Sequence, residues 1–511
     1  MKLQSLFFSL FFVGFLFNGY SQVTSKEVML EKIKNEGFKN SQAMSMLGEL
    51  SDVYGQRLTG SNEYLAAATW MSDKMTSLGL QNVHFESYCE ECRGWSMESF
   101  HVEMVSPNYM HISAYPLAMT KSTPGIVTGD VVHIKSNKSL DSLKLEFSGK
   151  LKDKIVLLGK IPSKKSLNDT LFKRYNENDL NKMAQLDSAM VKQTPLPELF
   201  KSWETSDVRE EAFLKFLDEE GALAVLMSRS MYLGVLHPDG TYFYKNGQLK
   251  PLPYFTIMPE HFGRLARMID LNVIPKIRLN LETSFYSNPE NNVNVIAELT
   301  GTDKKLKSET ILVGAHFDSW HAGTGATDNG ANSIVLVEAL RILKSIGYQP
   351  KRTIKIGLWG GEEQAFLGSA AFAKNHYGIL GEKPNIASTK VSAYLNLDNG
   401  AGAIRGLYLQ DNALAKPVFK EVFSSISDIT EGILTIENTL STDHETFDHY
   451  NIPAFQFIQD PLDYNSVTHH SEMDLLEYVP EQDVIKNAVI MAWTIYSLSE
   501  NKEKVPRKIK N

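Results

Sequence analysis

Short apolar runs alternate with amphipathic segments along the chain from residue 293 onward. The apolar runs of strand length are residues 293–299, 310–314, 353–358, 392–397 and 454–457. The segments with apolar side chains at helical spacing are residues 331–345, 365–375 and 482–499. Because strands alternate with helices, the pattern predicts an α/β fold whose mostly parallel, twisted sheet is covered by helices.

The stretch between residues 121 and 287 has a different pattern. Its apolar runs predict strands at residues 129–134, 154–158 and 222–226, separated by a polar stretch over residues 163–192. The turn-rich sequence Asn288-Pro289-Glu290-Asn291-Asn292 follows it. A chain of 511 residues exceeds what one core usually organises. We therefore predict a main domain formed by residues 22–120 and 288–511, and a β-rich domain inserted at residues 121–287.

The first 21 residues have the pattern of a secretory signal peptide. Lys2 precedes an apolar run over residues 6–17, and the small residues Gly19 and Ser21 follow. The apolar run is shorter than the ~20 residues that a spanning helix needs. We expect cleavage after Ser21, which predicts a secreted or periplasmic protein without stable membrane insertion.

Charge and cysteine content narrow the possible functions. The net charge is -8, and no cluster of Lys and Arg is interleaved with aromatic residues, which argues against nucleic-acid binding. The only cysteines are Cys89 and Cys92, and two thiolates cannot complete a tetrahedral zinc site. A local disulfide, a redox pair and two free thiols are the possible states of this pair. We expect a structural disulfide.

Ionisable residues lie at or beyond the predicted strand ends, where functional groups of open α/β sheets collect. These residues are His316, Asp318, Asp328, Glu362, Glu363, Asp398 and His470. Each alone has an ordinary explanation, for example Asp328 as a helix cap. Their recurrence at successive strand ends predicts a site instead. The two histidines together with three of the five carboxylates suit a pair of divalent cations, and zinc fits this mixture of donors best.

Three motifs around these residues resemble the co-catalytic zinc exopeptidase family. They are Val313-Gly-Ala-His-Phe-Asp-Ser-Trp320, Gly325-Ala-Thr-Asp-Asn-Gly330 and Trp359-Gly-Gly-Glu-Glu-Gln364. The resemblance covers most of the mature chain. It implies that residues 121–287 form a protease-associated domain, that the protein binds two zinc ions, and that it forms a homodimer.

The resemblance also implies a role for each residue. The implied ligands of two zinc ions are His316, Asp328, Glu363, Asp398 and His470, with Asp328 bridging. Glu362 is implied as the general base, and Asp318 as the carboxylate that orients the His316 imidazole. His470 is preferred to His469 because a histidine four residues before Asp474 fits the family spacing.

The leading hypothesis is an exopeptidase or dipeptidase that acts on short peptides. Its alternatives are an aminopeptidase acting on longer peptides, a glutaminyl-cyclase-like acyltransferase with one zinc, and a receptor-like protein without catalysis. The complete set of ligands and base argues against the last two. Two positions depart from the family pattern. Thr442 precedes Asp443-His444 where the wider family has Ser-Asp-His, and His469 stands where many relatives have Tyr. His444 is either an oxyanion or substrate contact or a surface residue.

Overall fold

The computed structural model describes residues 25–135, 139–163, 168–229, 234–240, 250–383 and 385–509. The predicted signal peptide at residues 1–21 lies outside the described residues. Within the described ranges, no helix is both long and apolar enough to cross a membrane.

An eight-stranded sheet forms the centre of the main unit, in the order β1-β10-β12-β11-β13-β16-β14-β15. The strands are β1 (Gln81–Ser87), β10 (Val293–Leu299), β11 (Thr310–His316), β12 (Thr353–Trp359), β13 (Val391–Asn396), β14 (Ile404–Tyr408), β15 (Ile433–Thr435) and β16 (Ala454–Gln459). The central strands β12, β11, β13 and β16 run parallel, whereas β10 and β14 pair antiparallel with their central neighbours. The predicted α/β fold is confirmed, and it is the edges that make the sheet mixed.

Helices cover both faces of this sheet because its buried strands have apolar side chains on both sides. Ile311 and Val313 of β11 belong to the large core that includes side chains of α1 (Ser25–Lys39), α8 (Ala331–Ser345) and α13 (Glu481–Glu500). Leu312 faces the opposite core, built with α9 (Leu367–Tyr377) and α12 (His444–His449). Further helices of this unit are α2 (Ala43–Gly48), α3 (Asn62–Ser77), α10 (Ile386–Lys390) and α11 (Lys416–Ser424).

A second eight-stranded sheet has the order β3-β2-β9-β5-β6-β7-β8-β4. Its strands are β2 (Gly94–Ser106), β3 (Met110–His111), β4 (Ala114–Pro116), β5 (Val127–Ile134), β6 (Lys154–Leu158), β7 (Ala224–Met227), β8 (Tyr254–Ile257) and β9 (Lys276–Tyr286). The helices between residues 140 and 270 are α4 (Leu140–Phe147), α5 (Glu177–Ala184), α6 (Leu196–Glu219) and α7 (Pro259–Asp270). The sheet has its own core, which includes Val131, Ile155 and Phe255.

The second sheet begins earlier in the chain than residue 121, the boundary that the sequence predicts. Strand β2 pairs antiparallel with β9, from Gly94 opposite Tyr286 to Ser106 opposite Lys276, so residues 94–116 do not belong to the main sheet. The predicted boundary is wrong here because a long-range strand pairing leaves no mark in the local pattern. The predicted strands at residues 129–134, 154–158 and 222–226 correspond to β5, β6 and β7.

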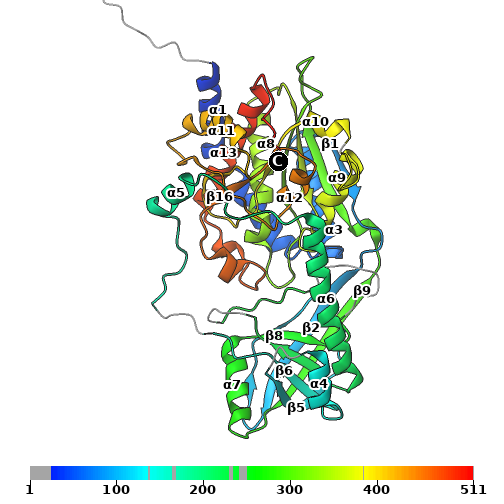
Figure 1. Ribbon diagram of the computed structural model, residues 1–511. Helices are drawn as coiled ribbons and strands as arrows, with labels where there is room; N and C mark the ends of the chain where they lie inside the picture. Colours follow the sequence, from blue (N-terminus) through cyan, green and yellow to red (C-terminus); the bar gives the residue numbers. More distant parts are fainter. Residues whose placement is uncertain are drawn as a thin grey trace, which may run out of the picture.

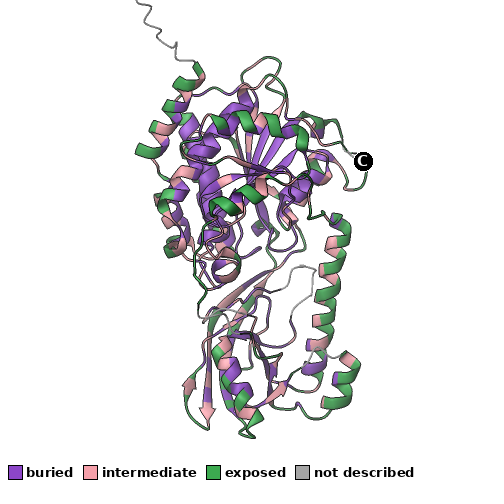
Figure 2. Ribbon diagram, turned by 60° about the vertical axis from the view of Figure 1, so that its left-hand side comes forward, coloured by how far each residue is buried: buried purple, intermediate pink, exposed green. Residues whose placement is uncertain are grey.

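The two sheets lie one above the other in Figure 1, and the long helix α6 extends from the lower unit toward the upper one. The strands at the centre of the upper unit are buried, whereas much of α6 is exposed (Figure 2). Where the chain passes from the main sheet to the second, Cys89 and Cys92 form the predicted disulfide.

Candidate active site

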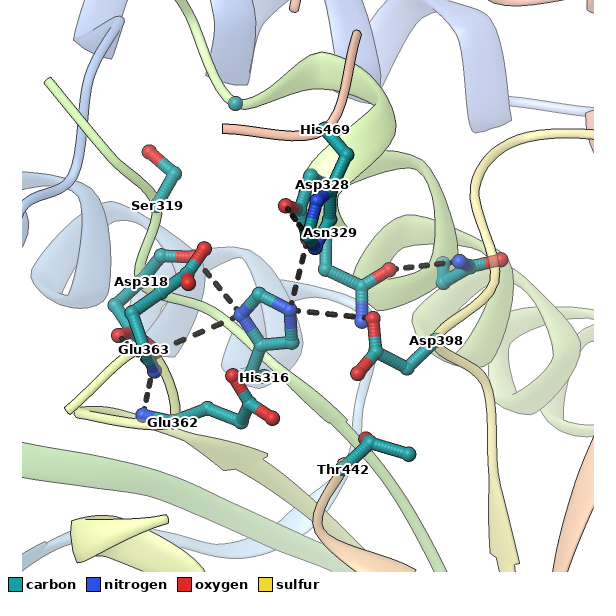
Figure 3. A network of polar contacts seen from close by, with 12 residues as sticks. His316, Asp318, Ser319, Asp328, Asn329, Glu362, Glu363, Asp398, Thr442 and His469 are labelled. Atoms are coloured by element: carbon teal, nitrogen blue, oxygen red, sulfur yellow. Dashed lines mark hydrogen bonds and ion pairs between the residues drawn. The ribbon is translucent and has the colours of Figure 1, made fainter. Parts of the chain in front are cut away.

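The parallel central strands bring their carboxyl ends to one edge of the main sheet, and the ionisable residues gather there. His316 is the last residue of β11, the Glu362–Glu363 pair follows β12, and Asp398 follows β13. Because β11 lies between β12 and β13, His316 sits centrally (Figure 3). Asp328 precedes α8, and His470 lies in the loop after β16.

Two glycines at the end of β12 shape the turn that presents the glutamates. A Cβ on Gly360 would lie 2.3 Å from the Tyr64 hydroxyl oxygen, and Gly361 has a φ of +67°, which favours glycine. After this turn the Glu363 carboxylate faces His470, whereas Glu362 lines the same pocket without pairing with His470. The adjacent glutamates are therefore available for different tasks.

His316 forms the first of two donor clusters. Its Nε2 lies 3.1 Å from Asp328 Oδ1 and 3.3 Å from Asp398 Oδ1 (Figure 3). All three side chains are buried or nearly so, with His316 1% and Asp328 3% exposed. Their donor atoms lie within 4.8 Å of one another, which is suitable for holding one cation.

His470 forms the second cluster. Its Nε2 lies 2.9 Å from Glu363 Oε2 and 3.7 Å from Asp328 Oδ2. His469 stacks on the His470 ring with centroids 3.6 Å apart, and its Nε2 lies 4.0 Å from Asp328 Oδ2. Asp328 thus presents one oxygen to each cluster.

The two clusters fit a pair of zinc ions. Imidazole and carboxylate donors are those that zinc prefers. Glu363 Oε1 is buried without a hydrogen-bond partner among the described residues, and a cation would satisfy it. Each imidazole Nε2 faces two carboxylate oxygens, an arrangement that a shared cation explains.

Burial dominates the electrostatics of the glutamate pair. It raises the pKa of Glu363 to about 7, although the charge of His470 opposes the rise. Burial also raises the pKa of Glu362 well above its usual range, with Asp398 and Asp443 adding to the effect and His316 opposing it. For Asp328 burial raises the pKa, but His316, His469 and His470 outweigh it and lower the value overall.

The Asp318 carboxylate links loops of the site by hydrogen bonds. It accepts hydrogen bonds from the backbone N–H groups of Glu362 at 3.2 Å and Glu363 at 3.3 Å, and from the Thr59 hydroxyl at 2.9 Å. His316 Nδ1 lies 3.0 Å from the backbone carbonyl oxygen of Asp318 and 3.6 Å from its carboxylate. The Asp318 carbonyl oxygen is thus the nearer acceptor for the imidazole, and the Asp318 carboxylate lies at ion-pair distance from the ring while it also fixes the glutamate turn.

A pocket of about 240 Å³ opens over the two clusters. Its lining residues include Trp203 of α6, which comes from the second-sheet unit, together with Phe366 and Tyr464. None of the three was predicted from the sequence, because single aromatic residues fit ordinary helix and loop positions. Among the described residues that line the pocket, none is Lys or Arg.

Arg57 is another residue whose role was not predicted from the sequence. It is fully buried and donates through Nε to Phe317 O at 2.7 Å and through Nη2 to Gly325 O at 2.8 Å. These bonds join the loop after β11 to the loop that presents Asp328. The run Arg57-Leu-Thr-Gly-Ser61 was the available signal, since a buried arginine requires many acceptors.

The sequence left two interpretations of His444, an oxyanion or substrate contact and a surface residue. His444 is fully buried, so the surface interpretation is wrong. Its Nε2 lies 3.0 Å from the Thr439 carbonyl oxygen, and the side chain is not among those lining the pocket. Burial lowers the pKa of His444 to about 3, which makes it a neutral residue of the interior.

The zinc-free protein is expected to lose stability as the pH rises from 6.5 to 8. Burial raises the pKa of Asp443 to about 8 and that of Glu363 to about 7, against ~4 in the unfolded chain. The folded state therefore holds protons that the unfolded chain releases, and stability falls through this window. Below pH 6.5 the buried His444, whose pKa is lowered to about 3, opposes the trend.

The measurement is the melting temperature in excess chelator across this pH range, repeated with zinc. Zinc is expected to weaken the pH dependence because a bound cation keeps the carboxylates ionised. A zinc-free melting temperature that is constant or rises toward pH 8 would contradict the prediction.

Known proteins resemble this chain in sequence. Residues 294–494 match the sequence model of peptidase family M28. The chain is 26% identical over 505 residues to carboxypeptidase Q of Mus musculus, covering 96% of this chain and 95% of that protein. Identity to carboxypeptidase Q of Homo sapiens is 25% over 477 residues, with coverages of 92% and 88%.

Solved structures share the fold. The peptidase M28 precursor from Shewanella amazonensis superposes with a TM-score of 0.68 at 22% identity, covering 95% of this chain and 99% of that chain. BSAP, a zinc aminopeptidase from Bacillus subtilis, gives 0.56 at 18% identity, with coverages of 91% and 96%.

An α/β sheet with imidazole and carboxylate side chains gathered beyond its parallel strands is typical of a metal-dependent hydrolase. The chain is a zinc-dependent peptidase whose residues 294–494 match peptidase family M28 and whose site resembles that of the co-catalytic zinc exopeptidases.

Proposed function

We propose that this peptidase hydrolyses dipeptides or short peptides that have a free amino terminus, at a site that binds two zinc ions. The observation that carries the proposal is the position of Asp328, whose two oxygens face separate clusters containing His316 and His470. Glu362 lines the same pocket and forms no ion pair or hydrogen bond with His316 or His470. The relatives named carboxypeptidase Q and zinc aminopeptidase support a peptide substrate.

Each cluster would hold one ion. His316 and Asp398 would bind the first and His470 and Glu363 the second, with Asp328 shared between them. When bound, two zinc ions polarise a carbonyl group and lower the pKa of water. The chain's own contribution is to hold the five donors in place, with Asp318 and Arg57 fixing the loops that carry them.

Glu362 is the proposed general base. It is 8% exposed and lies in the pocket beside the donors. Its carboxylate would take a proton from the attacking water and deliver it to the amine of the leaving group. Burial raises its pKa, and this favours the proton uptake that the step requires.

The second-sheet unit is proposed to be an inserted, protease-associated-like domain that narrows the pocket. Trp203 of α6 lines the pocket, and its ring lies 5.7 Å from that of Phe366 in the main unit. A pocket narrowed in this way favours short peptide substrates over folded proteins. The homodimer and the secretion signal remain predictions.

An unblocked dipeptide is expected to be cleaved faster than its N-acetylated form. The pocket is lined by four acidic residues and, among the described residues, by no Lys or Arg, so it suits an ammonium group better than a free carboxylate. Acetylation removes the charge that would pair with the acidic groups. An unsatisfied buried partner costs ~1–3 kcal/mol, or roughly a 5- to 150-fold loss in kcat/KM.

The rates to compare are those of a free dipeptide, its acetylated form, its C-amidated form and a longer peptide with a free amine. Equal rates for the free and acetylated dipeptides would exclude amine recognition. A preference for the longer peptide would favour the aminopeptidase alternative, which the structural likeness to BSAP makes the second candidate. Metal analysis that finds a single zinc per chain would favour the glutaminyl-cyclase-like alternative.

A further inference from the structure

A segment of the second-sheet unit, residues 234–240, lies against the loop that carries His469 and His470. We call this segment the strap. The Leu236 N–H donates to Glu472 Oε2 at 2.7 Å, and the Glu472 N–H donates back to the Leu236 carbonyl oxygen at 3.3 Å. His237 Nδ1 lies 3.1 Å from the His469 carbonyl oxygen. The two units are therefore joined directly beside the candidate zinc site.

The strap places the carboxylate of Asp239 beside His470. Asp239 Oδ2 lies 3.8 Å from His470 Nδ1, and the two side chains are 11% and 15% exposed. The Nε2 atom of the same ring faces Glu363 at 2.9 Å. Trp320 packs at an edge of the His470 ring, with centroids 5.7 Å apart. The imidazole is thus enclosed between carboxylates of two different units.

Arg229 holds Asp239 in place from within the second-sheet unit. Arg229 Nη1 lies 2.5 Å from Asp239 Oδ1, and Nη2 lies 3.6 Å from Glu210 Oε1. The pairing leaves Asp239 Oδ2 as the oxygen nearest His470. A fixed, charged carboxylate beside a partly buried imidazole is an arrangement that can determine the tautomer of the ring.

The backbone of His470 gives an independent reason for such support. Its φ of 56° lies in the left-handed region, which residues other than glycine rarely adopt. A strained residue keeps this conformation only when its surroundings hold it there. The contacts of the strap with His469 and Glu472, on either side of His470, supply that restraint.

We propose that Asp239 is a positioning residue that orients the His470 imidazole through its Nδ1 side, so that the second-sheet unit takes part in zinc binding. The proposal rests on the proposed function, since it assumes that His470 is a zinc ligand through Nε2. At 3.8 Å the Asp239 carboxylate lies at ion-pair distance from Nδ1, and its negative charge favours the tautomer with the proton on Nδ1, which leaves the lone pair of Nε2 directed at the metal. Asp239 itself contacts neither metal nor substrate in this arrangement.

The test compares Asp239→Asn with wild type in zinc affinity, using metal-free protein and competition with a chromogenic chelator. The variant keeps the shape of the side chain and removes its charge. One of two zinc equivalents is expected to bind ~10- to 100-fold more weakly and the other as in wild type. The melting temperature of the metal-free protein should fall only slightly, because Arg229 loses the charge of Asp239 but keeps Glu210 as a second partner. Asp218→Asn, at an exposed ion pair with Lys121 in the same unit, is the matched control and should leave both affinities unchanged.

His470→Ala separates failure of this inference from failure of the proposed function. If His470→Ala loses one zinc and Asp239→Asn binds zinc as wild type does, the positioning role is overturned and the proposed function stands. A lower metal-free melting temperature of Asp239→Asn with unchanged zinc affinity would also overturn it, because the role would then be structural. If His470→Ala keeps both affinities, the proposed ligand set fails, and the positioning role fails with it.

Discussion

The Glu362→Gln variant is expected to hydrolyse peptide substrates at least ~10²–10⁴-fold more slowly than wild type while still binding two zinc ions. The amide has nearly the same size as the carboxylate but cannot accept the proton of the attacking water. Glu362 makes no ion pair with His316 or His470, so its replacement should leave both donor clusters intact. The measurements are kcat and KM with a free dipeptide, and the zinc content per chain.

Two matched variants serve as controls for Glu362→Gln. Glu363→Gln changes the neighbouring side chain in the same way but alters a residue 2.9 Å from His470 Nε2, so it should lower zinc content. Glu382→Gln, at an exposed position of the main unit, should change neither rate nor zinc content. Lost zinc in Glu362→Gln and full zinc in Glu363→Gln would reverse the assignment of base and ligand.

Replacing Asp328 by alanine is expected to have the largest effect on metal binding. Its two oxygens face both donor clusters, so the substitution removes a ligand from each. Activity should fall below that of any variant at a terminal ligand. Zinc stabilises the folded protein by about 2.7 kcal/mol at a concentration one hundred times its dissociation constant, and the variant should lose most of this gain.

Thermal unfolding with and without added zinc measures this loss, and metal analysis accompanies it. Wild type treated with a chelator and then given zinc should recover both activity and melting temperature. Asp398→Ala is the matched comparison, because Asp398 faces only the His316 cluster and its loss should weaken one ion more than the other. An Asp328→Ala protein that retains two zinc ions and a near-normal rate would rule out the two-metal site.

The elements of the main unit could be predicted closely because burial shapes their local pattern. The predicted segments 293–299 and 331–345 have the bounds of β10 and α8, since the first is buried in the sheet and the second between two layers. The limit of the second sheet could not be predicted, because the pairing of β2 with β9 joins segments far apart in the sequence. Local periodicity reports which face is buried and not which strand lies beside it.

The sequence by itself determined the chemical inventory of this protein: which imidazoles and carboxylates follow strands, and that their motifs resemble zinc exopeptidases. Strand ends can be located from residue patterns, and parallel strands must end at a common edge. Only the tertiary structure decided that His444 is buried away from the pocket and that Trp203 lines it. It also decided that Asp239 lies beside His470. These placements depend on how two separately packed units meet, and no local pattern in either unit records that contact.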